Sequence, residues 1–220
     1  MFSDIYKQAP VSLPRRQTGR LEPARYYMKK IIVPVEVSAR HIHLSEKDLE
    51  ILFGKGYKLK KLRDLSQTGE FAAKEILIAF RQDHPKGCLK LRVLGPTRKE
   101  SQIEISRTDA INLDVDAPLK LSGDLKKVKT FLVVKGPQGK TKVKAIVAKR
   151  HLHVSAAQAK NLKLKNGQKV NAQVVGERGL VFENVIVRVA ENYNLACHID
   201  TDEANACGLG KVCGSGYLLK

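Results

Sequence analysis

The chain has 220 residues, a formal net charge of +18 and a sequence pI of ≈ 9.8. This length allows one or two domains, and the basic balance favours polyanionic partners such as nucleic acid, an anionic membrane surface or phosphorylated small molecules. Aromatic residues make up only 5% of the chain and Trp is absent, which argues against binding of single-stranded nucleic acid by base stacking. No apolar run reaches the roughly 18–20 residues of a membrane span.

Residues 1–28 are expected to form a disordered or weakly ordered extension. Three prolines, at positions 10, 14 and 23, interrupt any long helix, and the segment lacks the apolar core of a signal peptide. An apolar run begins shortly after Met28, so residues 1–27 are either an added segment or lie upstream of an alternative start. The four cysteines form no Cys-x-x-Cys pair and are expected to be reduced.

A histidine motif occurs twice. Residues 31–39 are rich in β-branched side chains and predict a strand, which leads into Arg-His-Ile-His-Leu-Ser at residues 40–45. A related Arg-His-Leu-His-Val-Ser occupies residues 150–155, an offset of 110 residues that is half the chain. Because residues i and i+2 of a strand share a face, the two histidines of each copy project together and suit a metal such as zinc. A single copy is more often an exposed or satisfied pair, but the duplication favours metal ligation.

The segment after the first copy predicts short strands and brief helices. Ser45 and Asp48 have the form of a capping box for a helix at residues 46–54. A second short helix is expected with Thr108 or Asp109 as its cap. Strands are expected at residues 57–65, 70–80, 89–94, 102–106, 131–134 and 143–148.

The second half repeats this order. A helix is expected after Ser155, then strands at residues 169–176, 179–189 and 194–199 and a short helix near Asp202. Residues 210–220 are rich in glycine and are expected to be irregular. Since short strands dominate and the sequence is duplicated, we predict a mainly β fold of two small β-barrel domains, related by a pseudo-twofold and capped by short helices.

The two halves also align near their ends, where residues 103–110 correspond to residues 197–204. This alignment places Glu104 on His198 and gives each half three ligand-type side chains. His₂Glu and His₃ are both catalytic zinc sets that leave an open position. Glu104 taken alone is as readily an ordinary polar strand residue, and His84, between turn residues, is expected to be exposed and without function. The two predicted sets are His41, His43 and Glu104, and His151, His153 and His198.

With these residues the chain resembles the PduL-type phosphate acyltransferases, also called phosphate propanoyltransferases. The matching segments follow the family's order and cover about residues 31–210. They are VEVSARHIHLS at 35–45, LRDLSQTGEFA at 62–72, RVLGPTR at 92–98, EISRTD at 104–109, GERG at 176–179 and HIDTDEAN at 198–205.

The resemblance implies a first β-barrel domain at residues 41–147 and a second that combines residues 29–40 with residues 148–220. It implies a reversible reaction in which acyl-CoA and phosphate give acyl-phosphate and coenzyme A, with a propanoyl or acetyl group transferred. Two Zn²⁺ ions would be held by the six side chains given above, and Arg98 would be the catalytic, phosphate-binding arginine. The positions that correspond to coenzyme A contacts are Ser38, Arg63, Arg92, Leu94, His198 and Asn205.

The chemistry agrees with the residues. Phosphate must attack a thioester carbonyl and expel a thiolate, and zinc can polarise the carbonyl, hold phosphate and stabilise the leaving sulfur. Arg98 can bind phosphate through its fork of donors, although without the resemblance it would more often be a solvated loop cation. No Ser or Cys nucleophile is required, so direct transfer without an acyl-enzyme is predicted.

The family also implies a homodimer, with neither nucleic acid nor a membrane as partner. Members that serve bacterial microcompartments carry an amphipathic N-terminal helix. Here only Phe2, Ile5 and Tyr6 precede Pro10, so a free cytoplasmic enzyme is expected, with the microcompartment lumen as the alternative.

Two other functions remain open. A dinuclear zinc hydrolase of thioesters or phosphoesters would use the same ligands, and phosphate-dependent formation of acyl-phosphate separates it from an acyltransferase. A basic β-barrel module with structural zinc would instead bind nucleic acid. Only the net charge supports that module, and a steep salt dependence of binding would test it.

Overall fold

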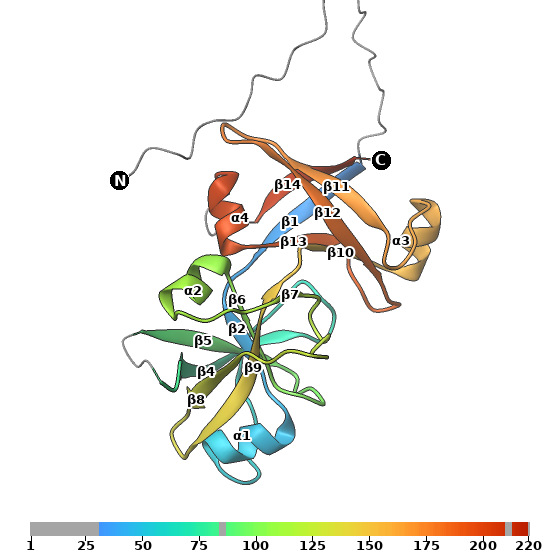
Figure 1. Cartoon of the computed structure of the whole chain (residues 1–220). Coiled ribbons are helices and arrows are strands. Elements are labelled where there is room, and N and C mark those ends of the chain that lie inside the picture. Colours follow the sequence, from blue (N-terminus) through green and yellow to red (C-terminus); the bar gives the residue numbers. More distant parts are fainter. Residues whose placement is uncertain (1–30, 84–86, 210–212, 220) are drawn as a thin grey trace, which may run out of the picture.

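The computed structural model describes residues 31–83, 87–209 and 213–219, which form two β-barrels with a few short helices (Figure 1). The expected extension at residues 1–28 and the exposed position of His84 lie outside the described residues. No helix within the described ranges is long and apolar enough to cross a membrane.

The first barrel is a closed ring of six strands in the order β4-β5-β2-β6-β9-β8, because β8 pairs with both β9 and β4. Two short strands extend this sheet outside the ring: β3 pairs with β4, and β7 pairs with β9. The elements are β2 (His41–His43), α1 (Glu46–Phe53), β3 (Lys61–Asp64), β4 (Phe71–Phe80), β5 (Cys88–Gly95), β6 (Gln102–Ile105), α2 (Arg107–Asn112), β7 (Leu119–Lys120), β8 (Phe131–Lys135) and β9 (Lys140–Ala148).

The second barrel is a closed ring in the order β1-β13-β10-β12-β11-β14, with β14 pairing back to β1. Its elements are β1 (Ile31–Ser38), β10 (His151–Val154), α3 (Ala156–Asn161), β11 (Lys169–Val174), β12 (Leu180–Val189), β13 (Ala196–Asp200), α4 (Thr201–Ala206) and β14 (Gly214–Leu219). The predicted fold class of two β-barrels with short helices is therefore confirmed.

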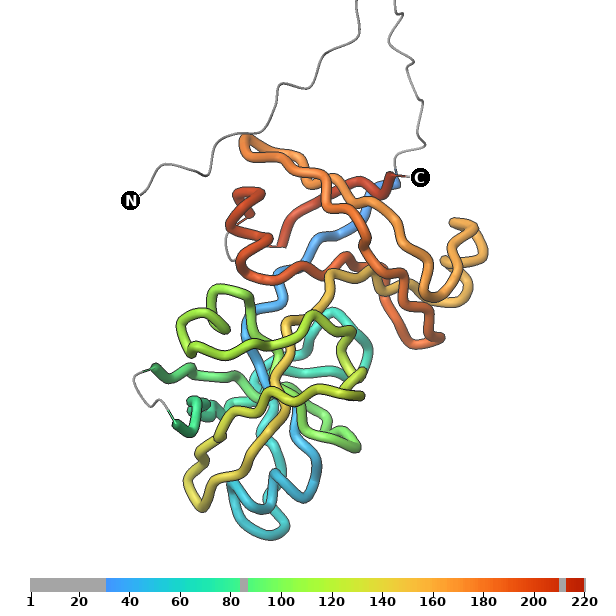
Figure 2. The backbone as a smooth tube through the Cα atoms, viewed as in Figure 1, coloured from blue at the N-terminus to red at the C-terminus, as the bar shows by residue number. Residues whose placement is uncertain are grey.

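The two barrels exchange strands. β1 lies in the second barrel, whereas β2, which follows it directly, lies in the first. In the same way β9 lies in the first barrel and β10, its continuation, in the second. The tube in Figure 2 passes between the barrels at these two places, once in blue and once in yellow-orange. Each crossing ends at a His-x-His segment, so both segments lie at the junction of the barrels.

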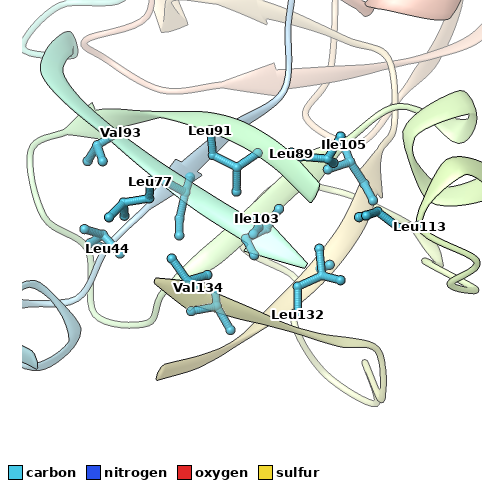
Figure 3. Packing of buried hydrophobic residues seen from close by; sticks show 14 of the residues in the cluster. Leu44, Leu77, Leu89, Leu91, Val93, Ile103, Ile105, Leu113, Leu132 and Val134 are labelled. Atoms are coloured by element: carbon cyan, nitrogen blue, oxygen red, sulfur yellow. The ribbon is translucent and has the colours of Figure 1, made fainter. Parts of the chain in front are cut away.

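Strand periodicity decides where the histidines point. Ile42 and Leu152, the residues between the paired histidines, are fully buried in the cores of the first and second barrel respectively. Because alternate residues of a strand face opposite sides, the flanking histidines point away from these cores. Figure 3 shows the first core, where Leu91 of β5, Ile103 of β6 and Leu132 of β8 pack together. Burial of each such side chain stabilises the fold by roughly 1.5–3 kcal/mol.

Two sequence-based expectations are wrong. The N-cap of α2 is Ser106, not Thr108 or Asp109, and Asp109 is the third helical residue, where it completes a capping box with Ser106. Residues 214–219 form the strand β14 rather than an irregular tail. Gly216 allows the neighbouring strand β11 to lie close, because a Cβ at this position would lie 2.7 Å from the carbonyl oxygen of Gln173.

Candidate metal and substrate site

The first group of ligand-type side chains comes from two neighbouring strands. His41 and His43 project from β2, and Glu104 projects from β6, where it lies directly opposite His41 in the antiparallel ladder. One donor atom from each residue lies within 4.8 Å of the others. The Nε2 atoms of His41 and His43 are 3.6 Å and 3.9 Å from the same Glu104 oxygen. All three side chains are buried, and the group can hold a metal ion.

The second group repeats this arrangement in the other barrel. His151 and His153 project from β10, and His198 projects from β13 opposite His151. The ring centroid of His198 lies 5.1 Å from that of His151 and 4.7 Å from that of His153. Their donor atoms also lie within 4.8 Å of one another. The alignment of Glu104 with His198 therefore corresponds to equivalent positions in space.

The crossing segments orient one histidine in each group. The Nδ1 atom of His41 lies 2.8 Å from the carbonyl oxygen of Ala39, and that of His151 lies 2.9 Å from the carbonyl oxygen of Lys149. A hydrogen bond from Nδ1–H to a carbonyl leaves Nε2 as the free donor atom, as in most histidine metal ligands.

Several buried ring nitrogens have no hydrogen-bond partner among the described residues: Nδ1 of His43, both ring nitrogens of His153, and Nε2 of His198. Buried polar atoms in native proteins are nearly always paired. The unpaired nitrogens of His153 and His198 belong to the second group, whose donor atoms lie within 4.8 Å of one another. A metal ion would satisfy such an arrangement, so the residues present fit a bound metal.

The first group carries charge. Burial lowers the pKa of His41, but the charge and hydrogen bond of Glu104, together with the Ala39 carbonyl, raise the pKa above its ordinary value of 6.5. Burial conversely raises the pKa of Glu104, yet the attraction of His41 holds it well below its ordinary value. The pKa of His43 lies well below 6.5 because of burial and the nearby charges of His41 and Arg98.

The second group is neutral. Burial lowers the pKa of His151 and of His198 to about 4 and that of His153 to about 2, and the Arg188 guanidinium adds to each shift. Neutral imidazole is the form that binds a metal. The Glu104 carboxylate of the other group acts in the opposite direction on His151 and His198, which indicates that the two groups are near neighbours.

Both groups line one cavity of about 720 Å³, which also receives side chains of both barrels. Arg98 lines this cavity, and its guanidinium donates to Glu70 Oε1 and to the Ser122 hydroxyl, each over 3.1 Å. Its backbone N–H donates to the carbonyl of Leu44, just after the first histidine pair. A half-buried arginine is thus held beside the candidate metal groups.

The positions expected to contact coenzyme A are distributed unevenly. Ser38, Arg63, Arg92 and Leu94 line the cavity together with His198. The Arg92 guanidinium is fixed by donation to the carbonyls of Ala73 and Lys74. Asn205 is exposed on α4 and does not line this cavity.

The cavity also contains side chains that sequence reasoning missed. Arg188 lies opposite His153 in the pairing of β10 with β12, and the ring of Tyr193 stacks on His153 at 4.0 Å. Gln67 reaches from the first barrel to the backbone of Asn194 in the second. These three lie outside the repeated motif, and only the register of strands far apart in sequence brings them to the site.

Comparison with known proteins gives a consistent result. The family described as phosphate propanoyltransferase matches residues 34–210. The phosphate propanoyltransferase of Priestia megaterium is 47% identical over 189 residues, which cover 84% of this chain and 85% of the relative. The protein of the same name from Thermotoga maritima is 46% identical, over 80% of this chain and 83% of the relative. That from Salmonella typhimurium is 43% identical, over 82% of this chain and 86% of the relative.

Proposed function

The chain belongs to the phosphate propanoyltransferase family, and from that premise we propose that it transfers a short acyl group, propanoyl or acetyl, reversibly between coenzyme A and phosphate. The observation that supports this most directly is the shared cavity, in which two metal-binding groups and Arg98 meet. The cavity is large enough for an extended ligand as well as a small anion.

The donor atoms of both groups suit zinc. Imidazole nitrogen and carboxylate oxygen are ordinary zinc ligands, and three protein ligands leave a position open for substrate. His41, His43 and Glu104 would hold one ion, and His151, His153 and His198 the other. When bound, zinc would supply polarisation of the thioester carbonyl and stabilisation of the anionic oxygen and sulfur.

The chain's own residues bind and orient the two substrates. Arg98 binds phosphate through its planar fork of donors, and its bonds to Glu70 and Ser122 fix the direction of that fork. Ser38, Arg63, Arg92, Leu94 and His198 contact coenzyme A inside the cavity, and Asn205 contacts it outside the cavity, on α4. A phosphate oxygen attacks the thioester carbon directly, the carbon–sulfur bond breaks, and the sulfur leaves with the electron pair and takes up a proton. No acyl-enzyme forms.

Three further assignments belong to this proposal. The first domain comprises residues 41–147, and the second combines residues 29–40 with residues 148–220. The protein acts as a homodimer. It works in the cytoplasm, and the lumen of a microcompartment is the alternative.

The experiment measures release of free thiol from propanoyl-CoA and acetyl-CoA, with and without phosphate, on zinc-loaded protein. Thiol release that requires phosphate is expected, with loss of at least 100-fold in His41→Ala because a ligand is removed. Arg98→Gln is expected to lose about 10- to 100-fold in kcat/KM for phosphate, the loss of one charge-assisted contact. His84→Ala, the histidine outside both groups, and Lys99→Gln, an exposed neighbour of Arg98, are the matched controls and should keep full activity.

Other outcomes decide between the alternatives. Thiol release at the same rate without phosphate, with free acid as product, would identify a hydrolase. If zinc-loaded protein released no thiol from either substrate, the proposed reaction would be wrong for these substrates, and a salt-dependent binding assay with nucleic acid would come next.

A further inference from the structure

An arginine precedes the histidine pair in each copy of the motif, and both arginines form the same ion pair. Arg40 Nη2 lies 2.9 Å from Asp109 Oδ1, and Arg150 Nε lies 2.9 Å from Glu203 Oε1. Asp109 follows Glu104 by five residues, and Glu203 follows His198 by five. The internal repeat therefore preserves this pair together with the ligand groups.

Each carboxylate also makes a second bond. Asp109 Oδ2 accepts from the backbone N–H of Ser106 at 3.4 Å, and Glu203 Oε2 accepts from that of Asp200 at 3.0 Å. Ser106 and Asp200 each stand two residues after the third member of their group. One carboxylate thus connects the residue just before the first histidine with the strand end just after the third ligand.

The two connected segments are adjacent strands. His41 is paired with Glu104, and His151 with His198. β2 has only three residues, so few ladder bonds fix its register. A slip of one residue would turn the ligands into the barrel core, because side chains alternate between the faces of a strand.

The burial of the pairs favours a local geometric role. Asp109 is almost fully buried, with 2% of its side chain exposed, whereas Arg40 is 42% exposed. The buried carboxylate has a fixed position, so it can hold the arginine that precedes the histidine pair in one place. Arg40 also lines the cavity, so contact with a substrate anion is a rival role for it. Arg150 does not line that cavity and still makes the equivalent pair, which favours the common role.

We propose that Arg40 and Arg150 are positioning residues, each of which aligns the ligands of its own metal group through Asp109 and Glu203. The inference rests on the proposed function, since it assumes that both groups hold zinc. Removing a contact that orients a metal ligand typically lowers metal affinity by about 10- to 100-fold.

The test measures zinc affinity in two backgrounds of the full chain that each retain one intact group. His151→Ala keeps the first group and His41→Ala keeps the second. Adding Arg40→Gln should weaken zinc binding about 10- to 100-fold in the first background and leave the second within twofold. Arg150→Gln should do the converse. The Co²⁺ absorption spectrum of the retained group should change in the same selective way.

Further variants separate positioning from loss of folding. Arg40→Lys keeps the charge but loses the planar fork of donors, so its zinc affinity should lie between that of the wild type and that of Arg40→Gln. Asp109→Asn should lower the zinc affinity of the first group alone. Combined with Arg40→Gln, it should lower that affinity no further than Arg40→Gln does by itself. Arg107→Gln is the matched control. Arg107 is an exposed arginine on α2, the helix that carries Asp109, and its guanidinium lies 4.0 Å from the Asp116 carboxylate. This substitution should leave zinc affinity unchanged.

The contrary outcomes are distinct. Suppose that the unsubstituted protein binds two zinc ions. If Arg40→Gln then lowered the zinc affinity of both groups equally, or of neither, this inference alone would be overturned. Unchanged zinc affinity with a raised KM for the coenzyme A substrate would assign Arg40 to substrate binding instead. A wild type that binds no zinc would overturn the metal assignment of the proposed function, and the inference with it.

Discussion

Glu104 and His198 occupy equivalent positions but give their groups different charge. With Glu104 ionised and the three imidazoles of the second group neutral, a divalent ion would keep more of its charge in the second group than in the first. The two groups are therefore suited to different tasks within one cavity, although the backbone around them is duplicated.

Cys197 is the neighbour of His198 but belongs to the core of the second barrel, with 1% of its surface exposed. Burial raises the pKa of its thiol to about 12. Cys207 is buried as well, whereas Cys88 and Cys213 are exposed. We expect a thiol reagent to modify two cysteines of the native protein at pH 8 within minutes and the other two only after denaturation, as counted by mass spectrometry.

The same shift sets a pH dependence. The unfolded thiol ionises near its ordinary value of 9.0, and the folded thiol only near 12. The folded state therefore holds the proton longer, and this contribution to stability is complete below pH 9 and is lost as the pH rises toward 12. Cys197→Ala should show a shallower alkaline loss of stability than Cys88→Ala. Rapid labelling of Cys197 in the native state would contradict this account.

At the scale of elements, β14 closes the second barrel by pairing with both β1 and β11. A Cβ on Gly216 would lie 2.7 Å from the Gln173 carbonyl oxygen and 2.9 Å from Val35 Cγ2. Gly216→Ala should therefore push the strands apart and lower the free energy of unfolding by about 1–3 kcal/mol. Denaturant unfolding measures the change.

The control for this prediction is the exposed neighbour in the same strand. Ser215→Ala should change the free energy of unfolding by less than about 0.5 kcal/mol. If Gly216→Ala were as stable as Ser215→Ala, close approach of the strands would not be what glycine provides there.

The sequence predicts most strands correctly because alternation of polar and apolar residues is a local signal. It also predicts both histidine pairs, since i and i+2 share a strand face. It fails at β14, where glycines remove the alternation signal and the neighbouring strands supply the order. It also misplaces the cap of α2, because Ser106, Thr108 and Asp109 are all good capping residues and only the hydrogen bonds decide among them.

The site shows the same limit. The sequence can place Glu104 in the candidate group with His41 and His43 because His198 repeats it. Arg188 and Tyr193 have no repeat partner of the same type, and their place in the cavity follows from the pairing of β12 with β10 and from the loop after β12. Contacts that depend on long-range register cannot be predicted from local patterns.

At the scale of the whole molecule, bonds on several sides hold the barrels together. Gln67 joins Asn194 through two hydrogen bonds. The backbone N–H of Thr108 in α2 donates to Asp202 of α4 over 2.8 Å. The covalent crossings before the two histidine pairs complete the connection, so the geometry between the two candidate metal groups depends on both barrels.

The strand exchange predicts the effect of a truncation. A chain that begins at Ala39 lacks β1, so β13 and β14 lose their shared neighbour and the core loses Val33 and Val35. Hydrogen exchange should show lost protection across the second barrel, with protection retained in β4 and β5. A chain that begins at Met28 is the control and should keep protection in both barrels. Unchanged protection without β1 would show that the second barrel closes without it.

The exchanged strands also bear on ancestry. A polypeptide of half this length, with one strand before one histidine motif, could not close its own barrel, because that strand enters the neighbouring one. Two identical copies would complete each other and form a symmetric pair with two identical ligand groups. Duplication and fusion of such a gene would yield a single chain of this topology, and only then would Glu104 and His198 be free to diverge.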